Sequence, residues 1–227
     1  MKSFEFNTIK KYPVICLIGK RRSGKSYMIR DLLYNHFHKQ RKYKNIMLIS
    51  PTSNMNTDYD LIPNKNKFEN FSSDLLEGLM ERQKKLIKDD PKGKYDTCIV
   101  LDDVVNMSDK NEARILSGLL VKSRHYRISV ILSLQYLKSR EFPPASRDNI
   151  DYAVIFKQHN KENVKNIVEQ WLGGDPQIEE LGYRMTTKIP DVSSHRVLII
   201  DSSEFGENIK EFTYQYIADK IPKKFTF

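Results

Sequence analysis

The feature that most constrains this chain is a glycine-containing loop that directly follows a short apolar run. Residues 19–26 read Gly-Lys-Arg-Arg-Ser-Gly-Lys-Ser, and residues 14–18 read Val-Ile-Cys-Leu-Ile. A buried strand that ends in such a loop and opens a helix directs several backbone N–H groups at one point. Gly19 and Gly24 permit backbone angles and close approaches that a side chain would block. The pattern predicts binding of a nucleoside triphosphate.

Each residue of the loop is a candidate for contact with the phosphates. Lys25 can reach the β- and γ-phosphate oxygens, and the Ser26 hydroxyl can bind Mg²⁺. The expected ligands are therefore ATP and Mg²⁺. The candidate nucleotide-binding residues are Gly19, Lys20, Arg21, Arg22, Ser23, Gly24, Lys25 and Ser26.

Apolar runs alternate with helical patterns along the chain. Continuous apolar runs are typical of strands that are covered on both faces. Strand–helix alternation predicts an α/β fold with a central, mostly parallel sheet, right-handed crossovers and helices on both faces. We expect strands at 13–18, 45–49, 97–101, 127–133, 151–156 and 196–200, helices at 24–38, 72–88, 111–122 and 160–172, and a polar loop at 51–71.

The length of 227 residues predicts a single domain, because no repeat or linker divides the chain. Its core is expected at about 12–160, and residues 160–227 would extend the same domain. The longest apolar segments are far shorter than the roughly 20 residues that span a bilayer, so no membrane insertion is expected. Because the first residues lack the apolar core of a signal peptide, we expect an intracellular protein.

A second candidate site follows the apolar strand at 97–101. Cys98-Ile99-Val100-Leu101 leads into Asp102 and Asp103, and parallel sheets bind ligands at the carboxyl ends of their strands. Asp102 is expected to hold Mg²⁺ beside Ser26, and Asp103 to polarise an attacking water. Without the phosphate loop upstream, this Asp-Asp pair would read as a solvated turn. Asp96 precedes the strand and is expected to lie at its other end, away from the site.

The strand at 127–133 is the candidate for an additional strand between the phosphate-loop strand and the acidic strand. In P-loop ATPases with that order, the tip of the extra strand faces the γ-phosphate. Ser133 and Gln135 can sense the phosphate there, with Gln135 preferred.

In this order Cys16 and Cys98 lie two strands apart, roughly 9–10 Å, which is too far for a disulfide. Both are expected to be buried, unpaired thiols.

Two arginines could complete the site of a neighbouring subunit, where the γ-phosphate develops negative charge. Arg124 is the first choice and Arg147 the second, although either could instead be an ordinary surface or DNA-contacting arginine. Lys138 and Arg140 follow the sensor strand and could contact a nucleic-acid backbone.

The chain is basic. Lys and Arg number 38 against 29 Asp and Glu, which gives a net charge of +9. A nucleic acid would explain this excess, although lysine-rich surfaces also aid solubility. The basic residues gather in three places: Lys39, Arg41, Lys42 and Lys44; Lys122, Arg124 and Arg127; and Lys223 and Lys224.

Taken together, the motifs resemble a known family. Gly-Lys-Arg-Arg-Ser-Gly-Lys-Ser, Val-Leu-Asp-Asp, Ser-Arg-His-Tyr-Arg-Ile-Ser, Ser-Leu-Gln-Tyr-Leu-Lys and Pro-Pro-Ala-Ser-Arg-Asp-Asn-Ile-Asp-Tyr follow one another in that order. This order is similar to that of the poxvirus-type genome-packaging ATPases of large DNA viruses, which belong to the FtsK–HerA class of P-loop NTPases. The resemblance spans about residues 12–160, and its motifs correspond to Lys25, Ser26, Asp102, Asp103 and Gln135.

The resemblance implies an ATPase that translocates double-stranded DNA into a preformed capsid as a homo-oligomeric ring. It also implies capsid or packaging-vertex partners, and a place in the cytoplasmic viral factory or nucleus of an infected cell or in the virion. Many relatives have Glu as the second acid, so the shorter Asp103 departs from the family pattern. Two alternatives remain: a small-molecule P-loop kinase, and a non-hydrolysing, nucleotide-dependent DNA-binding subunit.

Overall fold

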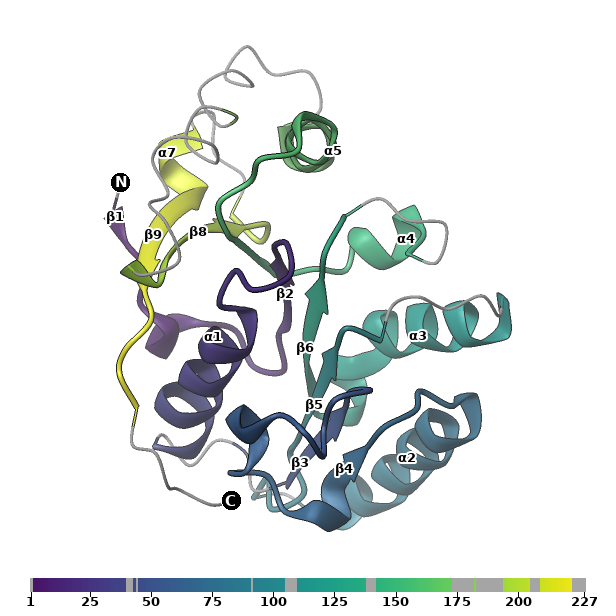
Figure 1. Ribbon diagram of the computed structural model, residues 1–227. Coiled ribbons are helices and arrows are strands. Elements are labelled where there is room, and N and C mark those ends of the chain that lie inside the picture. Colours follow the sequence, from purple (N-terminus) through teal and green to yellow (C-terminus); the bar gives the residue numbers. More distant parts are fainter. Residues whose placement is uncertain are drawn as a thin grey trace.

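A computed structural model describes residues 2–39, 43, 45–90, 92–104, 110–137, 142–172, 182, 194–204 and 209–221. Its strands form one nine-stranded sheet (Figure 1). The strands are β1 (Lys2–Ser3), β2 (Val14–Ile18), β3 (Asn45–Ile49), β4 (Lys67–Phe68), β5 (Thr97–Asp102), β6 (Ile128–Leu134), β7 (Tyr152–Ile155), β8 (Arg196–Asp201) and β9 (Thr213–Ile217).

The strand order is β1-β9-β8-β7-β2-β6-β5-β3-β4. Only the β7–β8 and β8–β9 pairs are antiparallel among the pairs described. The predicted mostly parallel sheet is confirmed, and so is the extra strand, because β6 lies between β2 and β5. Strand β8 pairs with β7, so the sheet continues from the part of the chain before residue 160 into the part after it.

Sequence reasoning missed β1, β4 and β9. The first two contain two residues each, too few for any periodicity. Strand β9 reads Thr-Tyr-Gln-Tyr-Ile and lies near one end of the sheet. It lacks the continuous apolar run of the central strands, because its residues are only partly covered.

The helices are α1 (Lys25–Asp31), α2 (Ser73–Leu86), α3 (Lys110–Lys122), α4 (Pro144–Arg147), α5 (Lys161–Leu172) and α7 (Ile209–Phe212). The helix predicted at 24–38 is present, but its second half, Leu32–His38, is a π-helix. Its apolar residues Ile29, Leu33 and Phe37 recur at every fourth position. This spacing identifies a helix but does not distinguish π-helical turns from α-helical ones.

The helices cover the sheet from both sides, as the sequence predicts (Figure 1). One core contains α1, its π-helical continuation and the segment at 59–62, and the other contains α2, α3, α5 and α7. Because strand side chains alternate between faces, Cys16 belongs to the second core and Cys98 to the first. The two thiols are buried and free, as predicted, and the sheet itself lies between them.

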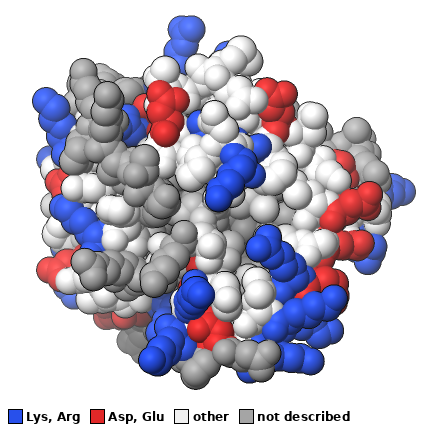
Figure 2. Space-filling model, turned by 90° about the horizontal axis from the view of Figure 1, so that it is seen from below, with Lys and Arg blue, Asp and Glu red and all other residues white. Residues whose placement is uncertain are grey.

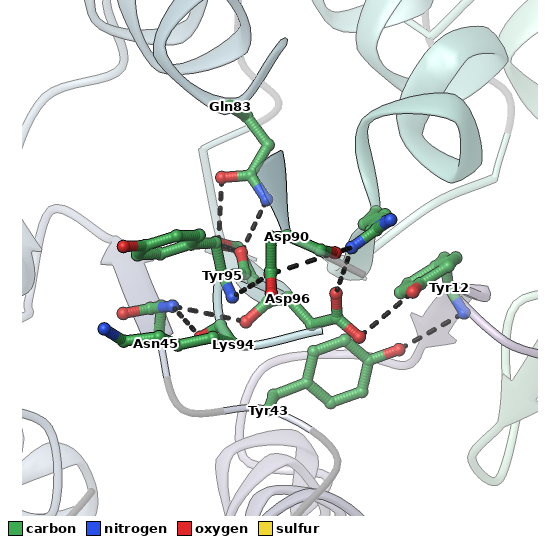
Figure 3. Close-up of polar contacts among 10 residues, drawn as sticks. Tyr12, Tyr43, Asn45, Gln83, Asp90, Lys94, Tyr95 and Asp96 are labelled. Atoms are coloured by element: carbon green, nitrogen blue, oxygen red, sulfur yellow. Dashed lines mark hydrogen bonds and ion pairs between the residues drawn. The ribbon is translucent and has the colours of Figure 1, made fainter. Parts of the chain in front are cut away.

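A polar cluster lies at the amino ends of β3, β5 and β6, at the edge of the sheet opposite the phosphate loop (Figure 3). The Tyr12 hydroxyl donates to Asp96 over 3.0 Å, and Arg127 pairs with Asp90 at 3.7 Å and with Asp96 at 4.0 Å. Asp96 therefore lies at the expected end of its strand. Arg127, grouped above with the basic residues available to a polyanion, is instead committed to these carboxylates.

The C-terminal strand is tied to the helix that follows the phosphate loop. The Asp31 carboxylate is fully buried and accepts hydrogen bonds from the Tyr216 hydroxyl at 2.7 Å and from the Asn35 amide. Burial raises the pKa of Asp31, and the two hydrogen bonds only partly oppose this.

No helix in the described part of the chain is long and apolar enough to cross a bilayer.

We expect Asp31→Asn to raise the melting temperature of the ligand-free protein at pH 7.5. A raised folded-state pKa means that the folded protein loses stability as pH rises from the unfolded value of Asp31 to its folded value. Asn is free of this penalty and its oxygen still accepts the Tyr216 hydrogen bond, while its NH₂ group can donate to Asn35 once the Asn35 amide turns over. The gain is about 2–4 °C for each kcal/mol in a chain of this size.

Thermal melts at several pH values test this expectation. The difference from wild type must shrink as pH falls towards 4 and vanish below it, since Asp31 is protonated in both states only below its unfolded-state pKa of 3.8. The exposed Asp60→Asn is the matched control and should not change the melting temperature. A variant less stable than wild type at pH 7.5 contradicts the burial argument.

Candidate nucleotide-binding site

The loop between β2 and α1 has the backbone shape of a phosphate cradle. Gly24 has φ of 95° and Arg22 has φ of 62°, so the chain passes twice through the left-handed region within three residues. The Gly19 N–H donates to the Leu134 carbonyl at 3.1 Å, which fixes the start of the loop to the end of β6. A Cβ on Gly19 would lie 2.6 Å from Ser23 Oγ and 2.8 Å from Phe156 Cβ. Only glycine fits there.

Lys25 lies inside this loop. Its ammonium donates to the carbonyl oxygens of Gly19 at 2.8 Å and Lys20 at 3.2 Å, and the residue is 6% exposed. Burial lowers the pKa of Lys25, while the charges of Asp103 and Asp102 raise it. The ammonium and the two carboxylates therefore lie close enough to interact, at the same edge of the sheet.

The two acids occupy different environments. Asp102 ends β5, is 4% exposed and lies in register with Ser133 of β6. Burial raises the pKa of Asp102, and a hydrogen bond from Tyr59 opposes that rise. Asp103 is exposed and has φ of 53°. Such a backbone conformation persists in a non-glycine residue only where the surroundings fix it, and it is frequent at functional sites.

Sequence reasoning missed Tyr59. This fully buried residue ends the 3₁₀ turn Thr57–Tyr59 in the loop predicted at 51–71. Its hydroxyl donates to Asp102 at 2.6 Å, and its pKa is raised well above the usual value by burial and by the Asp102 charge, with contact to Ser26 opposing this. Tyr59 thus lies between the two candidate Mg²⁺ ligands. No local pattern indicates it, because the contact joins residues 43 positions apart.

The donor set fits a magnesium–triphosphate. Buried Ser23 Oγ has no hydrogen-bond partner in the described part of the chain, and it faces the position where a Cβ on Gly19 would lie. Hydroxyl and carboxylate oxygens, from Ser26 and Asp102, are the ligands that Mg²⁺ prefers. Lys25 would supply the cation for the phosphate oxygens, and the loop amides would supply the dipoles.

The sensor candidates lie at the end of β6. Ser133 is buried and beside Asp102 in register, whereas Gln135 follows the strand and is exposed. The preferred residue, Gln135, is therefore at the expected edge and free to turn towards a phosphate.

A buried amide pair behind the sensor segment was also missed. Gln158 donates to the carbonyl oxygens of Ile18 at 3.1 Å and Phe156 at 2.7 Å, and its own carbonyl accepts from Asn163 at 2.7 Å. Asn163 in turn accepts from the Leu137 N–H at 3.2 Å. The pair connects the end of β2 to the segment that follows Gln135. Asn and Gln in a polar stretch give no sequence signal of burial.

The candidate trans-acting arginines do not reach their own subunit's site. Arg124 is exposed in the turn that precedes β6, at the amino end of the strand. Arg147 donates to Gln170 of α5 and to the Phe142 carbonyl, both at 2.9 Å. Lys138 and Arg140 lie outside the described residues.

Comparison with known proteins identifies the family of this chain. The model of the family described as Poxvirus A32 protein matches residues 1–224. The chain belongs to this family. An uncharacterized protein of Invertebrate iridescent virus 6 is 30% identical over 202 residues, which cover 87% of this chain and 73% of the relative. An uncharacterized protein of Acanthamoeba polyphaga mimivirus is 26% identical and covers 100% of this chain and 79% of the relative. This A32-family chain is thus a protein of virus-infected cells.

Solved structures share its P-loop NTPase fold. The genome packaging NTPase B204 from Sulfolobus turreted icosahedral virus 2, in complex with AMPPCP, aligns with a TM-score of 0.62 and 16% identity over 94% of this chain and 100% of that chain. The conjugation coupling protein TcpA of pCW3 aligns with a TM-score of 0.59 and 17% identity over 92% of this chain and 60% of that chain. The predicted resemblance to viral packaging ATPases of the FtsK–HerA class is confirmed.

We expect Gly19→Ala to weaken nucleotide binding more than tenfold, because the added methyl group collides with Ser23 and Phe156 and deforms the loop. Titration with a non-hydrolysable ATP analogue measures the loss. Gly78→Ala is the matched control, since a Cβ there has nothing within 4 Å and alanine favours the helix. Equal affinity in both variants would mean that the loop does not hold the phosphates.

Proposed function

We propose that this A32-family chain hydrolyses ATP and uses the energy to translocate double-stranded DNA into a viral capsid. The observation that carries the proposal is the sheet register, which aligns Asp102 through Ser133 of β6 with Leu17, two residues before the phosphate loop. The charges of Asp102 and Asp103 there act on the Lys25 ammonium. Family membership and the likeness to a genome packaging NTPase support a role in packaging DNA.

Each residue of the site has a separate task. The loop amides and Lys25 bind the triphosphate and orient its γ-phosphate. Asp103 accepts a proton from the attacking water, and Gln135 orients that water and the γ-phosphate. Ser26 and Asp102 would hold Mg²⁺, which neutralises charge on the β- and γ-phosphates when bound. Tyr59 orients Asp102 from behind.

A small-molecule kinase has less support than a DNA translocase. Phosphoryl transfer to a small acceptor needs a pocket facing the γ-phosphate. One cavity of about 530 Å³ lies at the starts of β3 and β5 and the end of α2, at the opposite edge of the sheet, and another of about 520 Å³ lies along α3. Neither of these two is lined by Lys25, Asp103 or Gln135. A non-hydrolysing switch is disfavoured because it would need neither Asp103 nor Gln135.

Basic side chains are available to a DNA backbone. Seen from below, Lys and Arg spread over the surface, with a large group towards the lower right beside acidic residues (Figure 2). The net charge of +9 supports a polyanionic partner, although the interleaved acids favour contacts spread over several subunits. In a homo-oligomeric ring around the duplex, each subunit would add its own contacts to the DNA. Capsid or packaging-vertex proteins would bind the ring.

We expect long duplex DNA to stimulate ATP turnover, and the stimulation to fall steeply between 50 and 200 mM salt, as for other contacts to the phosphate backbone. Lys25→Ala should abolish turnover. Asp103→Asn should lower kcat by at least about 100-fold, the usual contribution of a general base, while ATP binding is retained. Phosphate release measures the DNA stimulation and the turnover of both variants, and titration with a non-hydrolysable ATP analogue measures ATP binding.

The exposed Asp60→Asn is the control for the loss of a carboxylate and should behave as wild type. Turnover that is independent of DNA, with phosphate transferred to a small acceptor, would instead identify a kinase. Phosphate release no faster than in Lys25→Ala would leave the non-hydrolysing subunit as the better description.

Tyr59→Phe tests the position of the metal ligand. The ring still fills its buried site, but Asp102 loses the hydrogen bond that orients it. Loss of a group that orients a metal ligand typically weakens metal affinity about 10–100-fold. We therefore expect ATP turnover to need about ten times more Mg²⁺, and an unchanged Mg²⁺ dependence would separate Tyr59 from the metal site.

A further inference from the structure

A stacked aromatic pair lies next to the phosphate loop and has no part in the chemistry described so far. Tyr27 directly follows Ser26 in the first turn of α1, and its ring stacks on His195 with centroids 3.9 Å apart and planes 9° apart. Both residues are partly exposed. Flat aromatic faces at the surface beside a phosphate-binding loop are the features that bind a nucleobase.

The sheet register places this pair at the edge of the sheet where the phosphates bind. Ile18 pairs with Ile155, which pairs with Leu198 of antiparallel β8. His195 therefore precedes β8 at the carboxyl ends of β2 and β7. The segment after β9 returns to the same edge, where the Tyr27 hydroxyl donates to the Asp219 carbonyl at 2.9 Å. Figure 1 shows this segment running alongside α1.

The pair lies on the side of the loop away from the two acids. Asp102 ends β5 and Gln135 follows β6, and both strands lie on one side of β2. His195 precedes β8, which lies beyond β7 on the other side. If the γ-phosphate faces the acids, the α-phosphate and nucleoside extend towards Tyr27 and His195. This step rests on the proposed nucleotide-binding function.

The backbone holds His195 in an unusual conformation. Its φ is 49°, and its carbonyl accepts from the Ala218 N–H at 3.1 Å. A histidine in the left-handed region is uncommon, and positions of this kind often serve ligands. Hydrogen bonds to the segment after β9 hold both the His195 backbone and the Tyr27 hydroxyl where the two rings stack.

We propose that Tyr27 and His195 form the platform on which the purine base of the nucleotide stacks. The Tyr27 hydroxyl is already bonded to Asp219, so the platform offers ring faces and few free groups for the edge of a base. Stacking of this kind tolerates different bases because every base has a π-face. The site should therefore bind ATP and GTP within a few-fold of each other.

The test compares a ligand that carries a base with one that does not. Binding of ATPγS and of inorganic tripolyphosphate is measured for wild type, Tyr27→Ala, Tyr27→Phe and His195→Ala. We expect at least one alanine variant to bind ATPγS about tenfold more weakly, with tripolyphosphate affinity unchanged, and Tyr27→Phe to retain ATPγS binding.

Tyr34→Ala is the matched control. Tyr34 stacks on His38, with centroids 5.9 Å apart, further along the same helix and away from the loop. Its loss removes a similar Tyr–His stack and should leave both affinities unchanged. Thermal melts identify any variant that fails to fold, and His195→Ala tests the platform from a different element than Tyr27.

The outcomes separate this inference from the proposed function. Unchanged ATPγS affinity in both alanine variants overturns the platform, as does an equal loss of ATPγS and tripolyphosphate binding. Strong preference for ATP over GTP overturns the stacking mechanism. If neither ligand binds wild type better than Lys25→Ala, the nucleotide-binding function itself fails.

Discussion

The phosphate loop depends on the hydrogen bonds that hold the end of β2 between its two neighbours. The Gly19 N–H bonds to Leu134 of β6, and the Ile18 carbonyl accepts from Phe156 beyond β7 at 3.0 Å. With both sides fixed, the chain can leave the sheet only through the tight turn that curls around Lys25. The acidic strand reaches the same edge through β6, so the distance between loop and carboxylates is set by the sheet itself.

The buried amides of Gln158 and Asn163 extend this constraint to the sensor. They join the Ile18 carbonyl to the Leu137 N–H, and each amide uses both its donor and its acceptor groups in the chain of bonds. Buried polar groups are costly when one partner moves away. A shift of the loop on nucleotide binding would therefore be transmitted to the segment after Gln135 and to α5, which carries Asn163. Such a connection fits the proposed translocation, in which the state of the nucleotide must change the position of other surfaces.

The sequence predicts those parts of this arrangement that arise from local chemistry. The strand–loop–helix pattern at 14–38 and the apolar strand before Asp102 are contiguous, so periodicity and composition identify them. Tyr59, Gln158 and Asn163 are different, because their roles exist only after distant segments meet. Their residue types are also common in exposed loops, so burial cannot be read from them. The π-helical turn at 32–38 is intermediate, since its four-residue spacing is visible but is easily taken for an ordinary helix.

The positions of the two arginines decide which of them better fits the proposal that each site is shared between subunits. A strand of seven residues such as β6 spans roughly 20 Å, which exceeds the reach of an arginine side chain from the turn at Arg124 to its own γ-phosphate. Arg147 would have to release Gln170 and the Phe142 carbonyl before it could contact any ligand. The Arg124 side chain makes no hydrogen bond or ion pair with the described residues and can move without such a loss. If positive charge is added as the γ-phosphate leaves, Arg124 of an adjacent copy is the better placed of the two. The amino edge of one sheet would then face the carboxyl edge of the next, and this head-to-tail contact is of the kind that closes into rings.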